Sequence, residues 1–304
     1  MKKVFSLMLV LVLALSCAAL AEVPAQDRAG NDISIPENVE KIISLAPATT
    51  EILEAVGVMD KIIAVDTQTP FYVTVGDIPQ FDMMAPDVEA IAALEPDVVF
   101  TSGMSYIDGD PYHALVDMGV CDIEIPSSAS IEGVKEDIVF TAACVGKEAE
   151  GQALADDMQA QIDELAAIGA TITEKKTVFF EISALPYIYS CGKGTFIDDM
   201  LALVCAENVM GAQEGWLSVT EEDAVAANPD VILTSVNYLE DAVAEIMGRE
   251  GWQDVTAVKN GDVYYIDNGA SSLPDQNIVK AMREMALAIY PEAFAELAEE
   301  EPAA

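Results

Sequence analysis

The same short text occurs twice in this chain of 304 residues. The stretch "EPDVVFTS" begins at Glu95, and "NPDVILTS" begins 133 positions later at Asn228. A glutamate stands seven residues before the proline of each copy, at Glu89 and at Glu222. In both copies a short apolar helical pattern ends at the proline, which cannot continue a helix, and a Val/Ile-rich strand follows. The duplication predicts two α/β halves built on related plans.

The chain alternates strand and helix patterns on both sides of its middle. Short, continuous apolar runs between helices are typical of a parallel sheet that is covered on both faces. In the first half, strands are predicted at 41–46, 61–66, 97–102 and 121–126, and helices at 49–57, 87–95 and 112–119. In the second half, strands are predicted at 176–183, 230–235 and 261–267, and helices at 194–204, 221–228 and 276–290.

A long helical pattern without proline separates the two halves. It runs from about Ile131 to Ile168 and contains three glycines, so a break within it is open. We interpret it as a connecting helix, and the predicted fold is α/β, with two Rossmann-like lobes of parallel sheets joined by a long connecting helix. The predicted organisation is a signal peptide at 1–21, an N-terminal lobe at 22–130, the connecting helix at 131–170, a C-terminal lobe at 171–295 and an acidic tail at 296–304.

The first residues have the features of an export signal. Two lysines precede the apolar run "VFSLMLVLVLAL", and small residues at 19–21 suit cleavage. The run is too short for a comfortable membrane span, and no later stretch is apolar enough for one. "LALSC" is an imperfect lipoprotein box that would make Cys17 the lipidated residue. The chain is therefore expected outside the cytoplasm, in the periplasm or at the cell surface, either freely secreted or anchored through Cys17.

The charge of the chain excludes several partners. It has 53 Asp and Glu against 14 Lys and Arg, a net charge of −39. Nucleic acids, anionic membranes and polyanionic ligands would be repelled at long range. Most of these carboxylates are expected on solvated helix faces.

The remaining cysteines and the single histidine give no sign of a metal site or a cofactor. There is no CxxC and no clustered Cys/His spacing. Export permits disulfides, and four cysteines allow three pairings. Strand-like and helix-like surroundings favour buried free thiols, and the disulfide state stays open for Cys121, Cys144, Cys191 and Cys205.

No motif of an enzyme stands out. "GKGT" does not satisfy the P-loop pattern, no GxGxxG follows a strand, and GxSxG is absent. A Ser-His-Asp arrangement would have to use His113, beside which nothing locates a nucleophile. Carboxylates are so numerous that counting does not decide against a catalytic pair, and a secreted carboxylate-based hydrolase stays as the rival class. An adhesion or scaffold module would need neither the duplicated glutamates nor a cleft.

These features together resemble one known family. The chain is similar, from about Asp27 to Phe294, to the helical-backbone solute-binding proteins that serve ABC importers for cobalamin and ferric siderophores. The resemblance implies a non-enzymatic monomer in which Glu89 and Glu222 meet arginines on the two halves of a dimeric permease. The stretches that carry it are "IISLAPATTEILEAVG", "VEAIAALEPDVVFTS", "GKGTFIDDML", "GWLSVTEEDAVAANPDVILTS" and "WQDVTAVKNGDVYYID".

The same resemblance implies two lips of a cleft between the lobes. They are Met83 and Trp216, each six residues before one of the glutamates. Trp216 offers a flat apolar face and Met83 an adaptable one, where cobalamin binders tend to have an aromatic residue. Further candidates follow strand ends or, around Lys193, stand at a helix N-terminus between Gly192 and Gly194, whose backbone N–H groups could approach a ligand. They are Pro47, Ala48, Thr49, Ser105, Tyr106, Lys193, Asn237, Tyr238, Ser271 and Ser272.

The predicted ligand is a bulky metal chelate that is neutral or cationic. Catecholate siderophores are strongly anionic, whereas the candidate loops hold one lysine and no arginine. A cobamide or a ferric hydroxamate siderophore fits this poverty of cations. Haem is the alternative within the same importer class, with Met83 or His113 as axial ligand. A stiff helical connector predicts a small hinge motion on binding.

Overall fold

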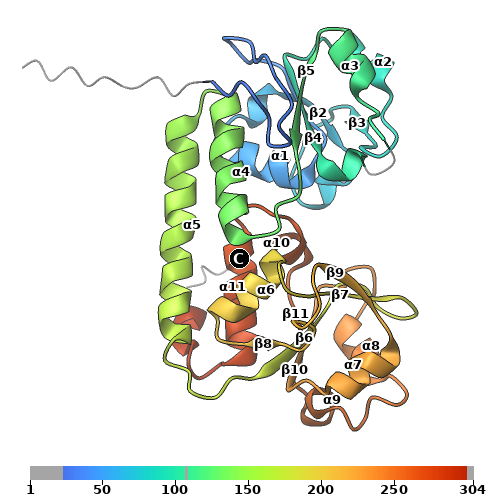
Figure 1. Ribbon diagram of the computed structural model, residues 1–304, viewed down its shortest axis with the longest axis vertical. Helices are drawn as coiled ribbons and strands as arrows, with labels where there is room; N and C mark the ends of the chain where they lie inside the picture. The colour runs from blue at the N-terminus through green and yellow to red at the C-terminus, as the bar shows by residue number, and fades with distance from the viewer. Residues whose placement is uncertain (1–22, 107–108, 300–304) are drawn as a thin grey trace, which may run out of the picture.

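The computed structural model describes residues 23–106 and 109–299, which form two lobes stacked along a pair of long helices (Figure 1). The predicted signal peptide, Cys17 and the last five residues of the acidic tail lie outside the described residues. The two lobes have separate sheets, and the strand order of each is that of a parallel α/β layer. The predicted fold class is confirmed.

The N-terminal lobe contains five parallel strands in the order β3-β2-β1-β4-β5. Neighbouring residues of β1 and β4 enter cores on opposite faces of this sheet: Ile42 and Val98 join one cluster, and Ile43 and Val99 join the other. This is why the strands have continuous apolar runs. The strands are β1 Ile42–Ser44, β2 Ile62–Asp66, β3 Gln80–Phe81, β4 Val98–Ser102 and β5 Cys121–Ile125, and the helices are α1 Pro47–Ala55, α2 Val88–Ala93 and α3 His113–Asp117, with 3-10 turns η1 Met59–Lys61, η2 Thr69–Phe71 and η3 Gly103–Tyr106.

The C-terminal lobe contains four parallel strands in the order β11-β10-β6-β8 and an antiparallel ribbon of β7 and β9. The ribbon, β8 and the short helices α8 to α10 were not predicted. The strands are β6 Thr177–Glu181, β7 Ile188–Cys191, β8 Glu207–Asn208, β9 Trp216–Val219, β10 Val231–Thr234 and β11 Val263–Tyr265. The helices are α6 Phe196–Leu203, α7 Glu221–Ala227, α8 Ala242–Met247, α9 Thr256–Asn260, α10 Asn268–Ser272 and α11 Ile278–Ile289, followed by the 3-10 turn η4 Ala295–Glu299.

The repeated Pro-Asp text has a structural role in both lobes. The residue before each proline, Glu95 or Asn228, has a left-handed backbone, with φ of 52° and 44°. The aspartate after the proline then ties the new strand to its neighbour: the Oδ2 atom of Asp97 accepts from the backbone N–H groups of Glu40 and Lys41 at 2.8 and 2.9 Å. Asp230 accepts from the backbone N–H of Thr177 in the same way, at 2.9 Å.

The stretch predicted as one connecting helix is two helices, α4 Ile131–Cys144 and α5 Glu148–Gly169. Gly146, with a φ of 70°, turns the chain back so that the helices lie side by side (Figure 1). They pack closely at Gly151, where an added Cβ would lie 2.3 Å from the Cβ of Ala142. The connector is therefore a helical hairpin, of which α5 runs past both lobes (Figure 1).

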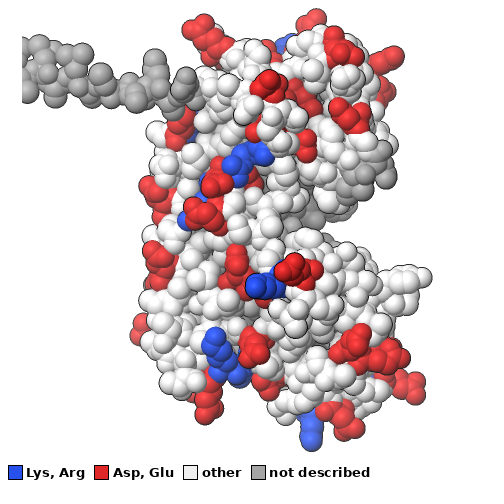
Figure 2. All heavy atoms as spheres, in the orientation of Figure 1, with Lys and Arg blue, Asp and Glu red and all other residues white. Residues whose placement is uncertain are grey.

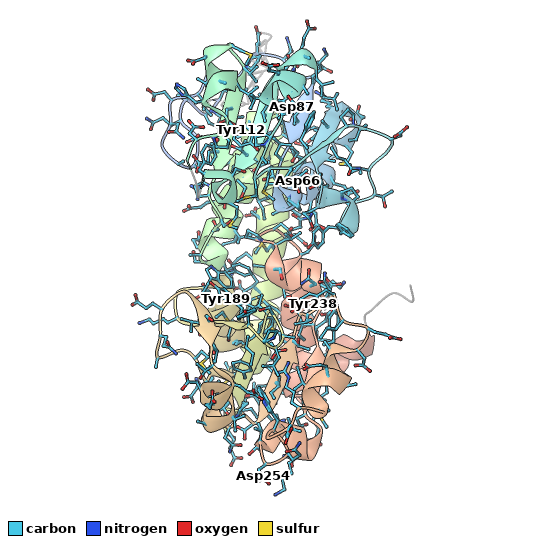
Figure 3. All side chains as sticks on the ribbon, turned by 90° about the vertical axis from the view of Figure 1, so that its right-hand side faces the viewer. Asp66, Asp87, Tyr112, Tyr189, Tyr238 and Asp254 are labelled. Carbon is cyan, nitrogen blue, oxygen red and sulfur yellow. The ribbon has the colours of Figure 1, made fainter. Side chains whose placement is uncertain are left out.

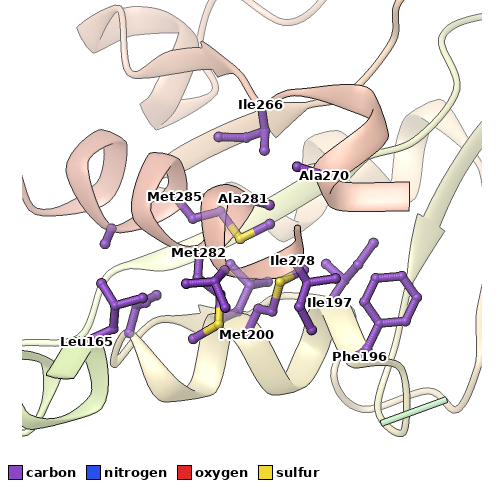
Figure 4. Packing of buried hydrophobic residues seen from close by; sticks show 14 of the residues in the cluster. Leu165, Phe196, Ile197, Met200, Ile266, Ala270, Ile278, Ala281, Met282 and Met285 are labelled. Carbon is purple, nitrogen blue, oxygen red and sulfur yellow. The ribbon is translucent and has the colours of Figure 1, made fainter. Parts of the chain in front are cut away.

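One hydrophobic core crosses from lobe to lobe. It includes Ile52 of α1 and Ile138 of α4, together with residues of α5, α6 and α11. Figure 4 shows the centre of this cluster, where Leu165 of α5, Met200 of α6 and Met282 of α11 meet. Apolar packing of this kind resists sliding, because interior side chains are close-packed in fixed arrangements.

Candidate functional site

A cavity of about 630 Å³ lies between the lobes, where the space-filling view is hollowed (Figure 2). The N-terminal lobe supplies the start of α1 after β1 and the segments that follow β4 and β5, so the carboxyl ends of parallel strands form this wall. The C-terminal lobe supplies the β7–β9 ribbon, the start of α6 and the segment after α10. The lining residues are Ala46, Pro47, Ala48, Thr49, Ile52, Gln68, Tyr72, Met83, Ser102, Met104, Ile125, Pro126, Ser127, Asp137, Tyr189, Phe196, Trp216, Ser272, Leu273 and Pro274.

Both predicted lips line this cavity from opposite lobes. Met83 is held through its backbone: its N–H donates to Asp66 at 3.0 Å, and its carbonyl accepts from the Tyr112 hydroxyl at 3.0 Å. Trp216 is 45% exposed, and its ring meets the edge of Phe196 with centroids 5.8 Å apart. The structure also brings four other predicted residues to the lining, namely Pro47, Ala48, Thr49 and Ser272.

Six of the predicted ligand-binding residues lie outside this lining. Ser105 and Ser271 are buried, and the Ser271 hydroxyl donates to the backbone carbonyl of Asp267 at 2.7 Å. Asn237 lines a neighbouring cavity. Tyr238 is 63% exposed, and its hydroxyl accepts from the backbone N–H of Ala184 at 2.8 Å.

The other two residues outside the lining, Tyr106 and Lys193, form hydrogen bonds within their own lobes. The Tyr106 hydroxyl donates to Asp122 at 2.6 Å. Burial raises the pKa of Asp122 to about 6, although that hydrogen bond and the one from Thr101 act against the rise.

The Gly-Lys-Gly loop around Lys193 packs against the loop that holds Gln213 and Gly215. The backbone N–H of Gly192 donates to Gly215 at 2.8 Å, and that of Lys193 donates to Gln213 at 2.7 Å. An added Cβ at Gly192 would lie 2.3 Å from the Gln213 carbonyl oxygen. The glycine is needed for this close approach of two loops, so the backbone N–H groups of Gly192 and Lys193 are used within the protein.

Several lining residues were not predicted from the sequence. Tyr72, Tyr189 and Phe196 add three aromatic rings, and Met104 adds a second flexible thioether. Tyr189 and Trp216 come together only because β7 pairs with β9, a contact between distant segments that no local pattern signals. The aromatic character of the sequence around 187–189 was the one available hint.

The lining carries almost no charge. Its described residues include no lysine, arginine or histidine, and its one carboxylate, Asp137, pairs with Arg28 at 2.6 Å. Burial raises the pKa of Asp137, while hydrogen bonds from Ser128 and Arg28 act in the opposite direction. His113 is exposed on α3, 3.8 Å from Asp110 and 3.7 Å from Asp117, and it does not line the cavity.

The structure offers no sign of a metal centre or a membrane span in its described part. Among residues 23–106 and 109–299, no group of three or more His, Cys, Asp or Glu is placed to hold an ion. Within the same ranges, no helix has both the length and the apolar character needed to cross a membrane. Cys121, Cys144, Cys191 and Cys205 are all free thiols.

The paired glutamates occupy matching places on the two lobes. Glu89 lies in the first turn of α2, which Asp87 caps, and Glu222 lies in the first turn of α7, which Thr220 caps. Both are exposed, and neither forms a salt bridge among the described residues. The helices α2 and α7 lie on the side of the molecule away from the α4–α5 hairpin (Figure 1). The turn geometry explains the repeated Pro-Asp but not these exposed carboxylates.

Two α/β lobes on a helical hairpin, with an apolar cavity between them, define a binding protein for a small molecule. The chain belongs to the family described as "Periplasmic binding protein", which it matches over residues 42–270. Members of this family are extracytoplasmic solute-binding proteins rather than enzymes, and the rival hydrolase is not supported.

Similar proteins agree on the class but differ in ligand. The chain is 32% identical over 278 residues to the ABC transporter substrate-binding lipoprotein YvrC of Bacillus subtilis, covering 90% of this chain and 87% of that protein. It is 26% identical over 253 residues to the vitamin B12-binding protein of Vibrio parahaemolyticus, covering 82% and 89%. The fold matches molybdate-bound MolA of Haemophilus influenzae with a TM-score of 0.77, 20% identity and coverage of 90% and 92%. An ABC permease partner and a small-molecule ligand follow from these relatives.

Proposed function

We propose that this chain captures a bulky metal chelate, a cobamide or a ferric hydroxamate siderophore, and delivers it to an ABC permease. The observation that carries the proposal is the character of the cleft: about 630 Å³, walled by four aromatic rings and two methionines, with no cation among its described lining residues. Such a volume is in the usual range for small-molecule sites, about 300–1,000 Å³. Flat apolar walls suit a macrocycle or the organic shell of a wrapped metal ion.

The same cleft argues against small or strongly anionic ligands. A buried anion needs paired positive charge or several donors, because transfer of an unpaired charge from water is costly. Molybdate, ferric catecholates and other polyanions would meet apolar walls, and the one lining carboxylate, Asp137, is already paired with Arg28. Haem is the second candidate, since Met83 lines the cleft and can serve as an axial donor, whereas His113 lies elsewhere.

Delivery is proposed to use the two exposed glutamates. Glu89 and Glu222 each present one carboxylate from a capped helix on the side opposite the hairpin. Each of these two exposed glutamates is called a prong. A dimeric permease with arginines on both halves would bind one prong with each half, so a single copy of this chain is sufficient for docking. The lipoprotein relative supports anchoring through Cys17, which would leave the carrier tethered near its permease.

A thermal-shift panel tests the ligand. The purified chain is heated with cobamides, ferric hydroxamates, ferric catecholates and haem, each at about 100 times its dissociation constant where this is known. A true ligand at that excess stabilises the folded state by about 2.7 kcal/mol. A shift with cobamides or hydroxamates supports the proposal, a shift with haem alone selects the second candidate, and a shift with catecholates alone rejects both.

Replacing Trp216 by alanine should weaken binding of the chelate. The indole supplies an exposed face from the C-terminal lip, and loss of such an aromatic contact costs about 2 kcal/mol, or about 30-fold in affinity. Titration calorimetry measures the change. Tyr187→Ala is the matched control, because Tyr187 is more exposed than Trp216 and does not line the cleft. Equal loss in the two variants would remove Trp216 from the site.

Ligand binding should change the overall dimensions little. The core that joins Ile52 and Ile138 to α5, α6 and α11 would have to be broken for a wide opening. Small-angle scattering of the empty and loaded protein should therefore give radii of gyration that agree within about 1 Å. A clear compaction on loading would contradict a stiff connection.

A further inference from the structure

A second cavity, of about 380 Å³, lies beside the cleft. Tyr72 lines both cavities, so the two are neighbours. Figure 3 looks toward the side of the molecule away from the hairpin. In this view Tyr189, which lines the cleft, and Tyr238 lie at opposite sides of the part of the C-terminal lobe that faces the N-terminal lobe. The second cavity is lined by Glu51, Phe71, Tyr72, Asn237, Tyr265, Asp267, Asn268, Gly269, Ala270, Asn277 and Lys280.

Tyr72 borders both cavities and is held in place by two contacts. The Tyr72 hydroxyl donates to Oδ1 of Asn268 at 3.2 Å, which also links the two lobes. Gly269 lies against the Tyr72 ring, where an added Cβ would be 3.0 Å from its Cδ1 atom. The second cavity is therefore the space that an arm of a ligand in the cleft would enter beside Tyr72.

The chemistry of the second cavity differs from that of the cleft. Two carboxylates line it: Glu51 accepts from the Asn277 amide, and Asp267 accepts from Lys280 at 2.8 Å. Glu284 lies behind the lining, where it accepts from the backbone N–H of Asp267 at 2.7 Å. Lys280 is the one cation among the described lining residues, so negative charge is in excess.

Asp267 contributes to this excess, whereas the neighbouring Asp275 does not. Burial alone would raise the pKa of Asp267, but the N–H of Ala270 and the ammonium of Lys280 lower it, and the net shift is downward. Asp267 is therefore ionised at neutral pH. Burial and the nearby Glu51 carboxyl raise the pKa of Asp275 well above its usual value, which favours the uncharged form of that acid.

Two aromatic rings border the same cavity and are open to solvent. Phe71 is 76% exposed and Tyr265 is 48% exposed. Exposed aromatic faces beside carboxylates attract cations, because the ring quadrupole and the negative charge act in the same direction. We propose that the second cavity binds a positively charged, amine-bearing arm of the ligand that occupies the cleft. This inference rests on the proposed function.

Charge variants of one chelate test the inference. The first probe series is a linear ferric trihydroxamate with a terminal ammonium, its N-acetyl form, which is neutral, and its N-succinyl form, which is anionic. The second series is a corrinoid with one peripheral amide carrying an aminoethyl, an unmodified or a carboxylate end. On the scaffold that binds, the cationic form should bind about tenfold tighter than the neutral form, and the anionic form about tenfold weaker.

Two conservative variants assign the effect to the cavity. Glu51→Gln keeps the acceptor for Asn277, and Asp267→Asn keeps the cap of α10. Each should lower the cationic-to-neutral preference to about threefold, measured as a ratio within one variant so that losses of stability cancel. Asp262→Asn is the matched control. Asp262 precedes β11, whereas Asp267 follows it, so this variant should leave the preference unchanged.

The outcomes separate the inference from the proposed function. If either scaffold binds but its affinity does not depend on the charge of the arm, the second cavity does not bind the arm, and capture of chelates stands. The same conclusion follows if the preference for the cationic arm persists in both variants. Absence of binding by both scaffolds at every arm charge overturns the proposed function and the inference with it.

Discussion

Replacing Glu89 and Glu222 together by alanine should reduce uptake about 100-fold while leaving ligand affinity unchanged. Each glutamate lies at the exposed start of a helix on a different lobe, so the two losses should add, at about tenfold for each single variant. Uptake of labelled ligand in cells that depend on this importer measures delivery, and calorimetry on the purified protein measures capture.

The control for this experiment must change the charge equally. Asp156→Ala with Asp163→Ala removes two exposed carboxylates from α5, on the hairpin side. That pair should leave both capture and uptake intact. Raising the salt concentration should slow delivery by the unmodified protein, because screened charges steer association less strongly. If capture itself fails in the Glu89 and Glu222 variants, the proposed division of labour is wrong.

Replacing Arg249 by methionine should destabilise the C-terminal lobe by about 3–5 kcal/mol. The Arg249 guanidinium makes two hydrogen bonds to the fully buried carboxylate of Glu181, at 2.6 and 2.9 Å, and also contacts Glu245. It stacks over the Trp252 ring, 4.7 Å from the centroid. The methionine variant leaves the Glu181 carboxyl buried and without its partner, and denaturant unfolding measures the loss.

The loss should depend on pH with a definite sign. Burial raises the pKa of Glu181, while Arg249 opposes the rise, so the pKa should climb further once Arg249 is gone. An acid with a raised pKa in the folded state binds its proton more tightly when folded. Its stability penalty is therefore absent below about pH 4.3, the ordinary pKa of glutamate, and grows as the pH rises toward the folded-state value. The stability deficit should shrink in acid.

A double variant checks the cause. Arg249→Met combined with Glu181→Gln removes the buried charge as well as its partner, and it should recover a large part of the lost stability. If the double variant is no more stable than Arg249→Met, lost packing on Trp252 rather than an unpaired carboxylate explains the effect. Trp252 also donates to Glu221 at 2.9 Å, next to Glu222, so this network supports the helix that carries one prong.

The strands and the lobe plan could be predicted because their signals are local. An apolar run of four to six residues bounded by Pro-Asp or Gly marks a buried strand without knowledge of its neighbours. The duplicated text marked the same turn twice, and Asp97 and Asp230 make equivalent hydrogen bonds in the structure. The hairpin was missed as a turn because Gly146 lies in a continuous helical pattern, where a glycine can be tolerated as well as break the helix.

One wall of the cleft could be predicted, because its position also follows from local signals. Its N-terminal wall follows the strand ends β1 and β4, and those positions are fixed by the topology of a parallel sheet. Its C-terminal wall comes from an antiparallel ribbon that pairs Cys191 with Trp216, which depends on contacts between distant segments. The buried pair of Glu181 and Arg249 spans 68 positions, and only the placement of a glutamate inside an apolar strand hinted at it.

The continuous core between the lobes also affects how empty and loaded carriers compete for the transporter. If the outer faces of the vacant and the occupied carrier are nearly alike, a transporter that grips both prongs holds vacant carriers about as readily as occupied ones. Import would then be fastest at an intermediate abundance of carrier and would slow when carriers outnumber their cargo. A preference for occupied carriers would then require the transporter to contact the cargo directly, at the opening between the prongs.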